Sequence, residues 1–255
     1  MAVRAAGDAG EVTGPAPGVL NMRPVIEGVA YRSSAPFGWD ATRVLRFLAE
    51  HGIDAVVDLR SPTESALVPW LLDHGGRAGL PELVSAPLDP TEGRPSGTRP
   101  LETPSDLADL YLWWTRERPD AVVRAVTPIA DGRTTLLHCA AGKDRTGVLS
   151  AVVHLAAGTP REEIVRDYAH TTVELPSVLL ALRDVYLRSH PEEARRAFAA
   201  PNPPVILTAP AAAMEAFLER FLQRHGSAEA YLRAAGMAGA SVERLAERLR
   251  AGARQ

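Results

Sequence analysis

Cysteine is almost absent from this sequence, whose 255 residues contain only Cys139. A single cysteine excludes an internal disulfide framework and any zinc or iron–sulfur site built on several cysteines. The seven histidines are scattered, and no two have the i, i+2 or i, i+4 spacing of typical metal ligands. We therefore expect a protein of a reducing compartment, without a metal centre or another cofactor.

Long apolar runs and an excess of positive charge are also missing. No run approaches the roughly 18 residues of a membrane span, and the first residues lack the apolar core of a signal peptide. The chain has 28 Lys+Arg against 31 Asp+Glu, a net charge of -3, which argues against a general nucleic-acid binder. We expect a cytoplasmic protein without membrane insertion. Export without a signal peptide would leave no mark in the sequence, and these features do not determine the oligomeric state.

The length and the hydrophobic fraction, 46%, are sufficient for a sizeable core without a metal or disulfide staple. Residues 1–18 are small and polar and rich in glycine and proline, which predicts a disordered leader. The remaining residues contain no internal repeat and no second α/β unit. We therefore predict one domain over residues 19–255.

Helical and strand patterns alternate along this domain. Asp40 is a helix N-cap, the following helix ends at Gly52, and residues 53–60 form a short apolar strand typical of a buried parallel sheet. We predict further strands within residues 82–89 and at 134–138, and helices over 105–118, 119–131, 145–158 and 161–172. The C-terminal hundred residues are predicted to be helical, with a proline-rich interruption at 199–210. This alternation is typical of an α/β fold.

The chemically informative segment is HCAAGKDRTG, residues 138–147, between a predicted strand and a predicted helix. A loop in this position points its N–H groups inward at the positive end of the helix, so Ala140, Ala141, Gly142 and Lys143 are expected to bind a tetrahedral anion such as phosphate. A glycine in such a loop permits a positive φ or a close backbone approach. Arg145 can bind two phosphate oxygens at once with its planar guanidinium.

The same surroundings are expected to activate Cys139. A thiol beside cationic groups at a helix N-terminus ionises readily, and the thiolate is the nucleophilic form. It could displace an alcohol or phenol from phosphorus and form a cysteinyl phosphate that water later hydrolyses. We expect Thr146 to donate its hydroxyl to the thiolate, and His138 to hold the loop through its ring nitrogens.

The HCxxGxxR[ST]G pattern resembles the signature of the cysteine-dependent protein tyrosine phosphatase superfamily. With Lys143-Asp144 before Arg145, it is most similar to the bacterial branch of tyrosine/serine phosphatases, which includes atypical lipid phosphatases. The resemblance covers roughly residues 19–250. It extends to further segments: Asn21-Met22-Arg23, Tyr31-Arg32-Ser33, Asp58-Leu59-Arg60 with Glu64, Ile164 with Asp167-Tyr168, and Gly226-Ser227 through Tyr231-Leu232 to Gly236.

This resemblance implies a single-domain α/β fold with a central, mostly parallel sheet flanked by helices and a helical C-terminal region. It also implies metal-independent hydrolysis of phosphomonoesters, with phosphorylated proteins or phosphoinositides as substrates. The sequence lacks the Trp-Pro-Asp acid loop of eukaryotic tyrosine phosphatases, and its proline-rich segment after Ser177 differs from the helical lid of relatives.

The general acid is therefore open among three aspartates. Asp144 is our first choice because it lies inside the loop, and Asp58 and Asp89 are rivals. Asp58 follows a predicted parallel strand and could instead orient Arg145 through a salt bridge. Arg60, two residues later, is a candidate for the phosphate pocket.

Other features have simpler interpretations. Arg23 and Arg32 are taken as surface charges, and Asp167-Tyr168 as helix packing. The aromatic cluster of Tyr111, Trp113 and Trp114 is taken as helix core. The alternative function is a catalytically silent module that binds phosphorylated partners in the same loop. That alternative is weakened because Cys139, Arg145 and Thr146 are all present.

Overall fold

The structure is a computed structural model that describes residues 18–72, 80–89, 101–189 and 205–254. A five-stranded sheet has the order β1-β2-β5-β3-β4. It comprises β1 (Arg23–Ile26), β2 (Ala30–Ser33), β3 (Ala55–Asp58), β4 (Glu82–Ser85) and β5 (Thr135–His138). Only β1 and β2 pair antiparallel, so the mixed α/β fold with a mostly parallel sheet is confirmed.

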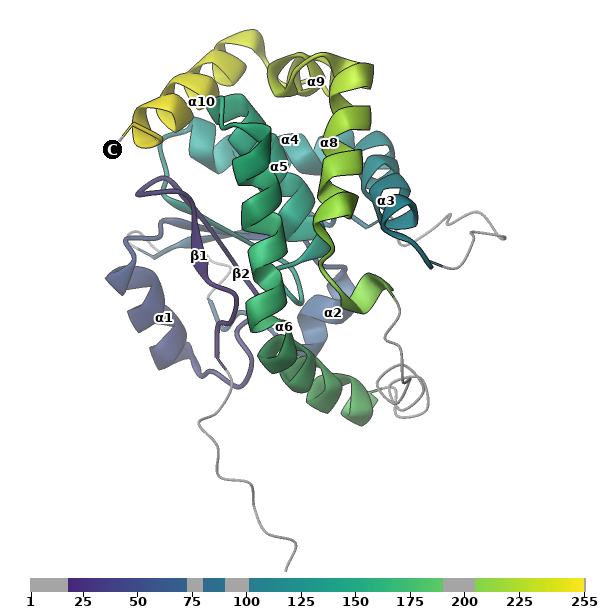
Figure 1. The fold of residues 1–255 in the computed structure, drawn as a ribbon. Coiled ribbons are helices and arrows are strands. Elements are labelled where there is room, and N and C mark those ends of the chain that lie inside the picture. The colour runs from purple at the N-terminus through teal and green to yellow at the C-terminus, as the bar shows by residue number, and fades with distance from the viewer. Residues whose placement is uncertain (1–17, 73–79, 90–100, 190–204, 255) are drawn as a thin grey trace, which may run out of the picture.

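Helices cover both faces of the sheet (Figure 1). On one face lies α1 (Ala41–Glu50), which packs through Val44, Phe47 and Leu48. The helices of the larger layer are α3 (Pro104–Glu117), α4 (Pro119–Ala130), α5 (Asp144–Ala157), α8 (Ala211–His225), α9 (Ala228–Ala234) and α10 (Gly239–Gly252). In this layer α5 is buried on nearly all sides, which is why its sequence is apolar all round.

Apart from the helix predicted over 161–172, the sequence-based elements agree with the structure to within a few residues, with three omissions. The strands β1 and β2 and the helix α2 (Pro62–Leu67) were not predicted, because elements of four to six residues carry too little periodicity. A capping box begins α2: the Ser61 hydroxyl accepts from the Glu64 backbone N–H, and the Glu64 carboxylate accepts from the Ser61 N–H.

The helix predicted over 161–172 is much longer than expected. The helix α6 (Arg161–Ser189) continues through Pro176 and packs near its end against the segment after β2. Within the predicted interruption at 199–210, residues 205–210 are described, and they begin with the short 3-10 helix η1 (Val205–Leu207). The predicted leader lies outside the described residues except for Gly18, so its boundary stays a prediction.

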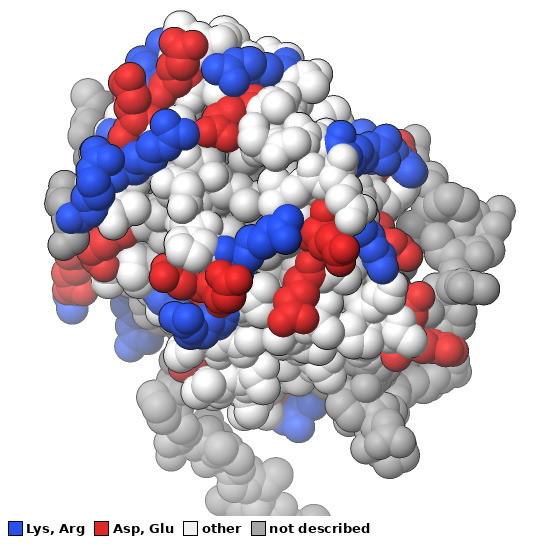
Figure 2. All heavy atoms as spheres, turned by 45° about the horizontal axis from the view of Figure 1, so that its top comes forward, with Lys and Arg blue, Asp and Glu red and all other residues white. Residues whose placement is uncertain are grey.

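Charges of both signs are mixed on the surface that Figure 2 presents, the face reached by bringing the top of Figure 1 forward. Lys and Arg side chains lie next to Asp and Glu side chains there, and neither sign forms a continuous field on this face. In the described ranges, no helix is long and apolar enough to cross a membrane.

The sheet topology determines where the Cys139 loop lies. The strand β5 is central, and its last residue, His138, is in register with Ser33 of β2 and Asp58 of β3. The carboxyl ends of these three parallel strands therefore meet at one edge of the sheet, where open α/β sheets bind their ligands. The Cys139 loop begins at this edge and leads into α5.

Candidate active site

The loop between β5 and α5 has its carbonyl groups tied to the surrounding protein. The Ala35 N–H donates to the first carbonyl, Ala140 O, at 3.0 Å. The Asn21 amide donates to the next two, Ala141 O at 3.3 Å and Gly142 O at 2.9 Å. In the part of the chain that the structure describes, the N–H groups of residues 140–143 donate no hydrogen bond. They remain available for an anion beside the 2% exposed Cys139.

Gly142 is required by a close approach of two backbone segments. Its φ is +67°, and a Cβ at this position would lie 2.4 Å from Ser33 O and 2.8 Å from Ser34 N. Because the obstructing atoms belong to the backbone at the end of β2, a side chain could not be accommodated by rotating a neighbour. The predicted need for glycine at this position of the loop is explained by both features.

Arg145 is held by Glu64, which approaches from the first turn of α2. Arg145 Nη1 and Nη2 donate to the two carboxylate oxygens at 2.6 and 2.7 Å. Burial alone would raise the pKa of Glu64, but the hydrogen bonds and charge of Arg145 hold it at about 2. Burial also opposes the charge of Arg145, yet Glu64 and the charge of Cys139 raise its pKa above the ordinary value. The pair is therefore fully ionised near neutral pH.

The hypothesis that Asp58 orients Arg145 is wrong, because Asp58 is engaged by Arg60. Arg60 donates to Asp58 Oδ1 through Nε at 2.8 Å and to Oδ2 through Nη2 at 2.7 Å, and the Ser65 hydroxyl adds a bond at 2.9 Å. Burial would raise the pKa of Asp58, but His138 and Arg60 together lower it well below its usual range. Both carboxylate oxygens of Asp58 thus accept hydrogen bonds from neighbouring side chains.

The Arg60 guanidinium is also committed to the protein. Besides Asp58, it donates from Nη1 to Val68 O at 2.8 Å.

In the sequence analysis, Glu64 was named only as part of the family resemblance. The S-x-x-E capping pattern after the β3 strand is the signal that could have placed its carboxylate at this edge of the sheet.

Lys143 and Asp144 lie together on the side of the loop that faces α3 and the segment before α8. Lys143 Nζ donates to Thr208 O at 2.5 Å and lies 2.8 Å from Asp144 Oδ1. The Tyr111 hydroxyl donates to the same Oδ1 at 2.5 Å and lies 2.8 Å from the Tyr168 hydroxyl. Burial and the charge of Asp144 raise the pKa of Tyr111 well above 10, so this hydroxyl stays protonated.

This chain of contacts changes two interpretations. Tyr111 is buried in the core, as expected, but its hydroxyl reaches Asp144 next to the Cys139 loop. Tyr168 is more than a packing residue, because its ring closes over Gly147 and its hydroxyl extends the chain from Asp144.

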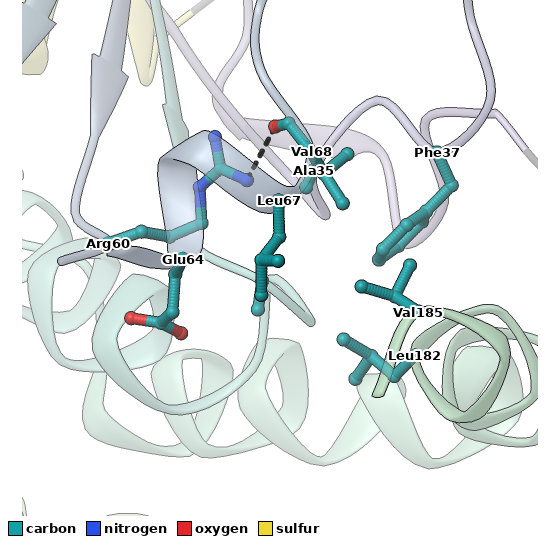
Figure 3. Close-up of a pocket in the computed structure, with 9 residues that line it drawn as sticks. Ala35, Phe37, Arg60, Glu64, Leu67, Val68, Leu182 and Val185 are labelled. Atoms are coloured by element: carbon teal, nitrogen blue, oxygen red, sulfur yellow. Dashed lines mark hydrogen bonds between the residues drawn. The ribbon is translucent and has the colours of Figure 1, made fainter. Parts of the chain in front are cut away.

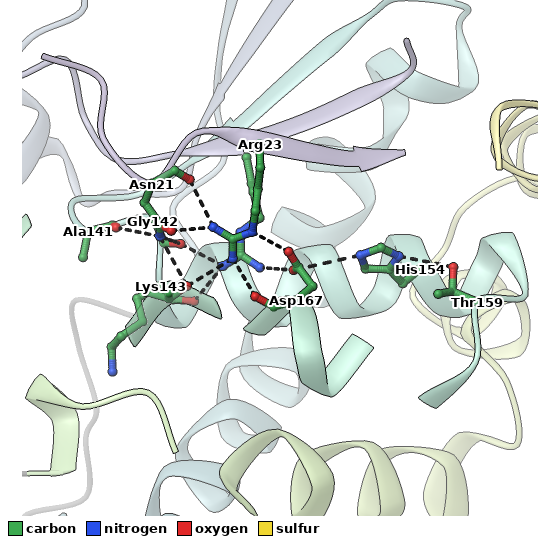
Figure 4. Close-up of polar contacts among 10 residues, drawn as sticks. Asn21, Arg23, Ala141, Gly142, Lys143, His154, Thr159 and Asp167 are labelled. Carbon is green, nitrogen blue, oxygen red and sulfur yellow. Dashed lines mark hydrogen bonds and ion pairs between the residues drawn. The ribbon is translucent and has the colours of Figure 1, made fainter. Parts of the chain in front are cut away.

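Arg23 and Arg32 are not surface charges, since both bind Asp167 beneath the loop (Figure 4). Arg32 is completely buried and also donates to Gly142 O at 2.8 Å. Arg23 donates from Nε to Asp167 Oδ1 at 2.5 Å and from Nη2 to the Asp167 carbonyl at 2.7 Å. Burial and the neighbouring Arg32 lower the pKa of Arg23 to about 10. We call Arg23, Arg32 and Asp167 the brace.

Asp89 and Thr146 complete the candidate residues. Asp89 lies half-buried beyond the carboxyl end of β4, accepts a 3.2 Å hydrogen bond from Trp114 Nε1, and adds to the negative potential at Arg145. The buried Thr146 hydroxyl has no hydrogen-bond partner among the described residues, so the expected bond to Cys139 is not made.

An apolar pocket adjoins the loop on the side of α2 (Figure 3). Leu67 and Val68 form one wall, and Leu182 and Val185 of α6 face Phe37 on the other side. Ala140, Ala35, Arg60 and Glu64 complete the lining. The described residues contain no cluster of three or more His, Cys, Asp or Glu side chains that could hold a metal ion.

Comparisons with known proteins identify related sequences. A model of the tyrosine phosphatase family matches residues 14–251. A tyrosine-protein phosphatase of Nostoc commune is 32% identical over 125 residues, which are 48% of this chain and 41% of that protein. The triple specificity protein phosphatase PtpB of Mycobacterium tuberculosis is 33% identical over 129 residues, 49% of this chain and 47% of that protein. The match thus spans about half the length of these curated relatives. Among solved structures, TpbA of P. aeruginosa is 16% identical, with a TM-score of 0.34 over 71% of this chain and 92% of that chain.

Proposed function

The chain belongs to the tyrosine phosphatase family, and from this premise we propose that it hydrolyses phosphate monoesters, foremost phosphotyrosine in proteins, through a cysteinyl-phosphate intermediate. One observation carries the proposal. The carbonyls of Ala140, Ala141 and Gly142 accept hydrogen bonds from Ala35 and Asn21. Within the described residues, the amides of residues 140–143 and three of the five Arg145 N–H groups stay free to surround a phosphoryl group beside Cys139.

In the first step, the Cys139 thiolate attacks phosphorus, and the bond from phosphorus to the phenolic oxygen breaks. A carboxylic acid gives its proton to the departing oxygen. In the second step, that carboxylate takes a proton from water, the water oxygen bonds to phosphorus, and the sulfur–phosphorus bond breaks to release phosphate and the thiolate. Loop amides and Arg145 stabilise the charge on the equatorial oxygens in both steps.

We assign the acid role to Asp144, which lies next to Arg145 in the loop. Its Oδ1 accepts from Tyr111 and Lys143, so the transferable proton belongs on Oδ2. Asp89 is the rival, with Oδ1 occupied by Trp114. Removal of a general acid costs 10²- to 10⁴-fold. Asp144→Asn should therefore lower kcat for phenyl phosphate by about 10²-fold, but much less for a nitrophenyl ester, whose leaving group needs no proton. If Asp89→Asn has that signature and Asp144→Asn lacks it, the roles are reversed.

The pocket beside Ala140 supports an aryl ester as the main substrate. Its aliphatic and aromatic lining offers an apolar surface against which a tyrosine ring or an apolar neighbouring residue could pack, which a serine or threonine side chain would use less well. Phosphoinositides are the second substrate class, supported by the ammonium of Lys143 beside the loop. To bind a second phosphate, Lys143 would have to exchange its contact with Thr208 O for the ligand.

The deciding experiment is the Cys139→Ser variant. We expect no turnover of phosphotyrosine peptide, but retained binding, because the loop amides and Arg145 are unchanged. The wild-type protein should hydrolyse phosphotyrosine peptide in EDTA, faster than phosphothreonine peptide or phosphoinositide. Undiminished hydrolysis by Cys139→Ser would refute the covalent route. Binding without turnover by the wild-type protein would establish the silent phosphate-binding module instead.

A further inference from the structure

Trp70 makes a hydrogen bond to the histidine that precedes the nucleophile. Its indole Nε1 donates to His138 Nε2 at 2.6 Å, and the two rings meet edge to face with centroids 5.1 Å apart. The exposed fractions are 3% for Trp70 and 0% for His138. Trp70 lies beyond the end of α2, in a segment where the sequence analysis identified no functional residue.

This contact determines which nitrogen of His138 carries a proton. An indole nitrogen can only donate a hydrogen bond, so His138 Nε2 must be the unprotonated acceptor. The proton of a neutral ring is then on Nδ1, which lies 3.1 Å from Cys139 O and donates to it. The indole of Trp70 therefore reaches the backbone of the nucleophile through one imidazole ring.

Without Trp70, the Asp58 carboxylate beside His138 would favour a proton on Nε2. Asp58 Oδ1 lies 3.5 Å from Nε2, and this carboxylate would attract a proton there. Arg60 and Arg145 oppose a positive ring, and burial is the largest influence that lowers the pKa of His138, to about 4. A proton on Nε2 would also point at the indole N–H, which is a second donor. Trp70 thus blocks the one position at which Asp58 could stabilise an imidazolium.

We propose that Trp70 is a positioning residue for Cys139: its indole N–H holds His138 in the neutral Nδ1–H tautomer, which in turn holds the Cys139 carbonyl and keeps positive charge off the residue before the nucleophile. The proposal rests on the proposed role of Cys139. It assigns a catalytic consequence to the segment after α2, which also supplies Val68 to the pocket.

The first test needs no activity and uses the full-length wild-type protein. Nitrogen-15 NMR of the histidine rings, with His138→Asn to assign the signals, should show His138 protonated on Nδ1 alone from pH 8 down to about 5, because its pKa is held near 4. A ring protonated on Nε2, or a cationic ring at neutral pH, would overturn the proposal whatever the enzyme does.

The second test is Trp70→Phe, which keeps an aromatic ring but removes the donor. We expect kcat for phosphotyrosine peptide to fall about tenfold with KM little changed, because the phosphate-binding amides and Arg145 remain. We also expect a new ionisation in the pH profile of kcat, which follows the His138 NMR titration and disappears in Trp70→Phe/His138→Asn. An unchanged tautomer and pH profile in folded Trp70→Phe would overturn the proposal.

The matched control is Trp39→Phe. Trp39 is a tryptophan of the same domain that packs edge to face against Phe47, away from the loop. The Trp39→Phe variant should show the same His138 signals and the same pH profile of kcat as the wild type. If wild-type protein proves inactive but shows the Nδ1–H tautomer, the proposed function fails and the Trp70 contact stands.

Discussion

Two pairings of arginine with carboxylate lie beside the same loop and differ in what their arginines bind. In the brace, Arg23 and Arg32 share Asp167 and spend further N–H groups on protein acceptors, including Gly142 O. In the other pairing, Arg145 donates one N–H from each terminal nitrogen to Glu64. Arg145 makes no other hydrogen bond within the described ranges, so three of its five N–H groups remain for a substrate.

The two pairings contain the same residue types but differ in how many arginine N–H groups stay free. An arginine that spends its N–H groups on protein acceptors holds the structure, whereas one with free N–H groups can also bind a substrate. The brace holds the Gly142 carbonyl of the loop through Arg32. The Arg145–Glu64 pair leaves N–H groups of Arg145 unused. Breaking each pair should therefore damage a different property, stability in the first case and turnover in the second.

Asp167→Asn should have the largest effect, because it removes the counter-charge of the completely buried Arg32. Breaking a buried ion pair by removing one partner costs about 3–5 kcal/mol. We expect the unfolding free energy in urea to fall by that amount, with kcat per folded molecule reduced much less. Asp184→Asn, whose partner Arg183 is exposed, is the matched control and should change stability by under about 0.5 kcal/mol. Equal stability of the two variants would contradict the role of the brace.

Glu64→Gln should show the opposite pattern. Glutamine preserves the size of the side chain and the capping box of α2, so we expect a loss of only about 1 kcal/mol in stability. The amide has one oxygen and places an NH2 donor where Glu64 has its second acceptor, so the two-oxygen pairing with Arg145 is lost. A misplaced guanidinium should lower kcat/KM by about 10²-fold. Steady-state kinetics on a nitrophenyl ester measures this. If Glu64→Gln unfolds as readily as Asp167→Asn but keeps full activity, the two pairings do not differ as described.

Lowering the pH should destabilise the protein in two phases, first through His154 beside the brace and then through Glu64 in its pair with Arg145. His154 lies 4.0 Å from Asp167 in the brace, and burial lowers its pKa to about 4 from an ordinary 6.5. Between these values the unfolded chain binds more protons than the folded one, so stability must fall as the pH drops from about 6.5 to 4. His138 contributes in the same window, since its pKa is also about 4.

The loss of unfolding free energy attributable to His154 is on the order of 3 kcal/mol, because burial lowers its pKa from 6.5 to about 4. The contribution of Glu64 is lost later, as the pH falls from about 4.5 toward its folded pKa of about 2. Urea unfolding at a series of pH values measures both phases. His154→Gln should flatten the dependence between pH 6.5 and 4, and an unchanged slope there would contradict the assignment.

The local features of this protein could be predicted from sequence because they depend on neighbouring residues. Cys139 lies in the loop after β5 and Arg145 in the first turn of α5, and this helix ends at Gly158, whose φ of +81° a glycine permits. The periodicity of apolar residues was sufficient to identify the longer helices and the central strands. It was not sufficient for β1, β2 and α2, which are too short to show a period.

The residues that orient the loop could not be found in this way, because tertiary structure alone brings them to it. Glu64 meets Arg145 across 81 positions, Trp70 meets His138 across 68, and Arg32 meets Gly142 across 110. The capping pattern that begins at Ser61 is a local signal for Glu64. No local pattern distinguishes Trp70 from a core aromatic residue or Arg32 from a surface charge. The sequence by itself determined the α/β class, and it contains the proposed nucleophile and the proposed phosphate-binding loop within one short segment. The parallel pairing of β2, β5 and β3, which places their carboxyl ends at one edge, decided which distant carboxylate, indole and guanidinium groups would hold that loop in place.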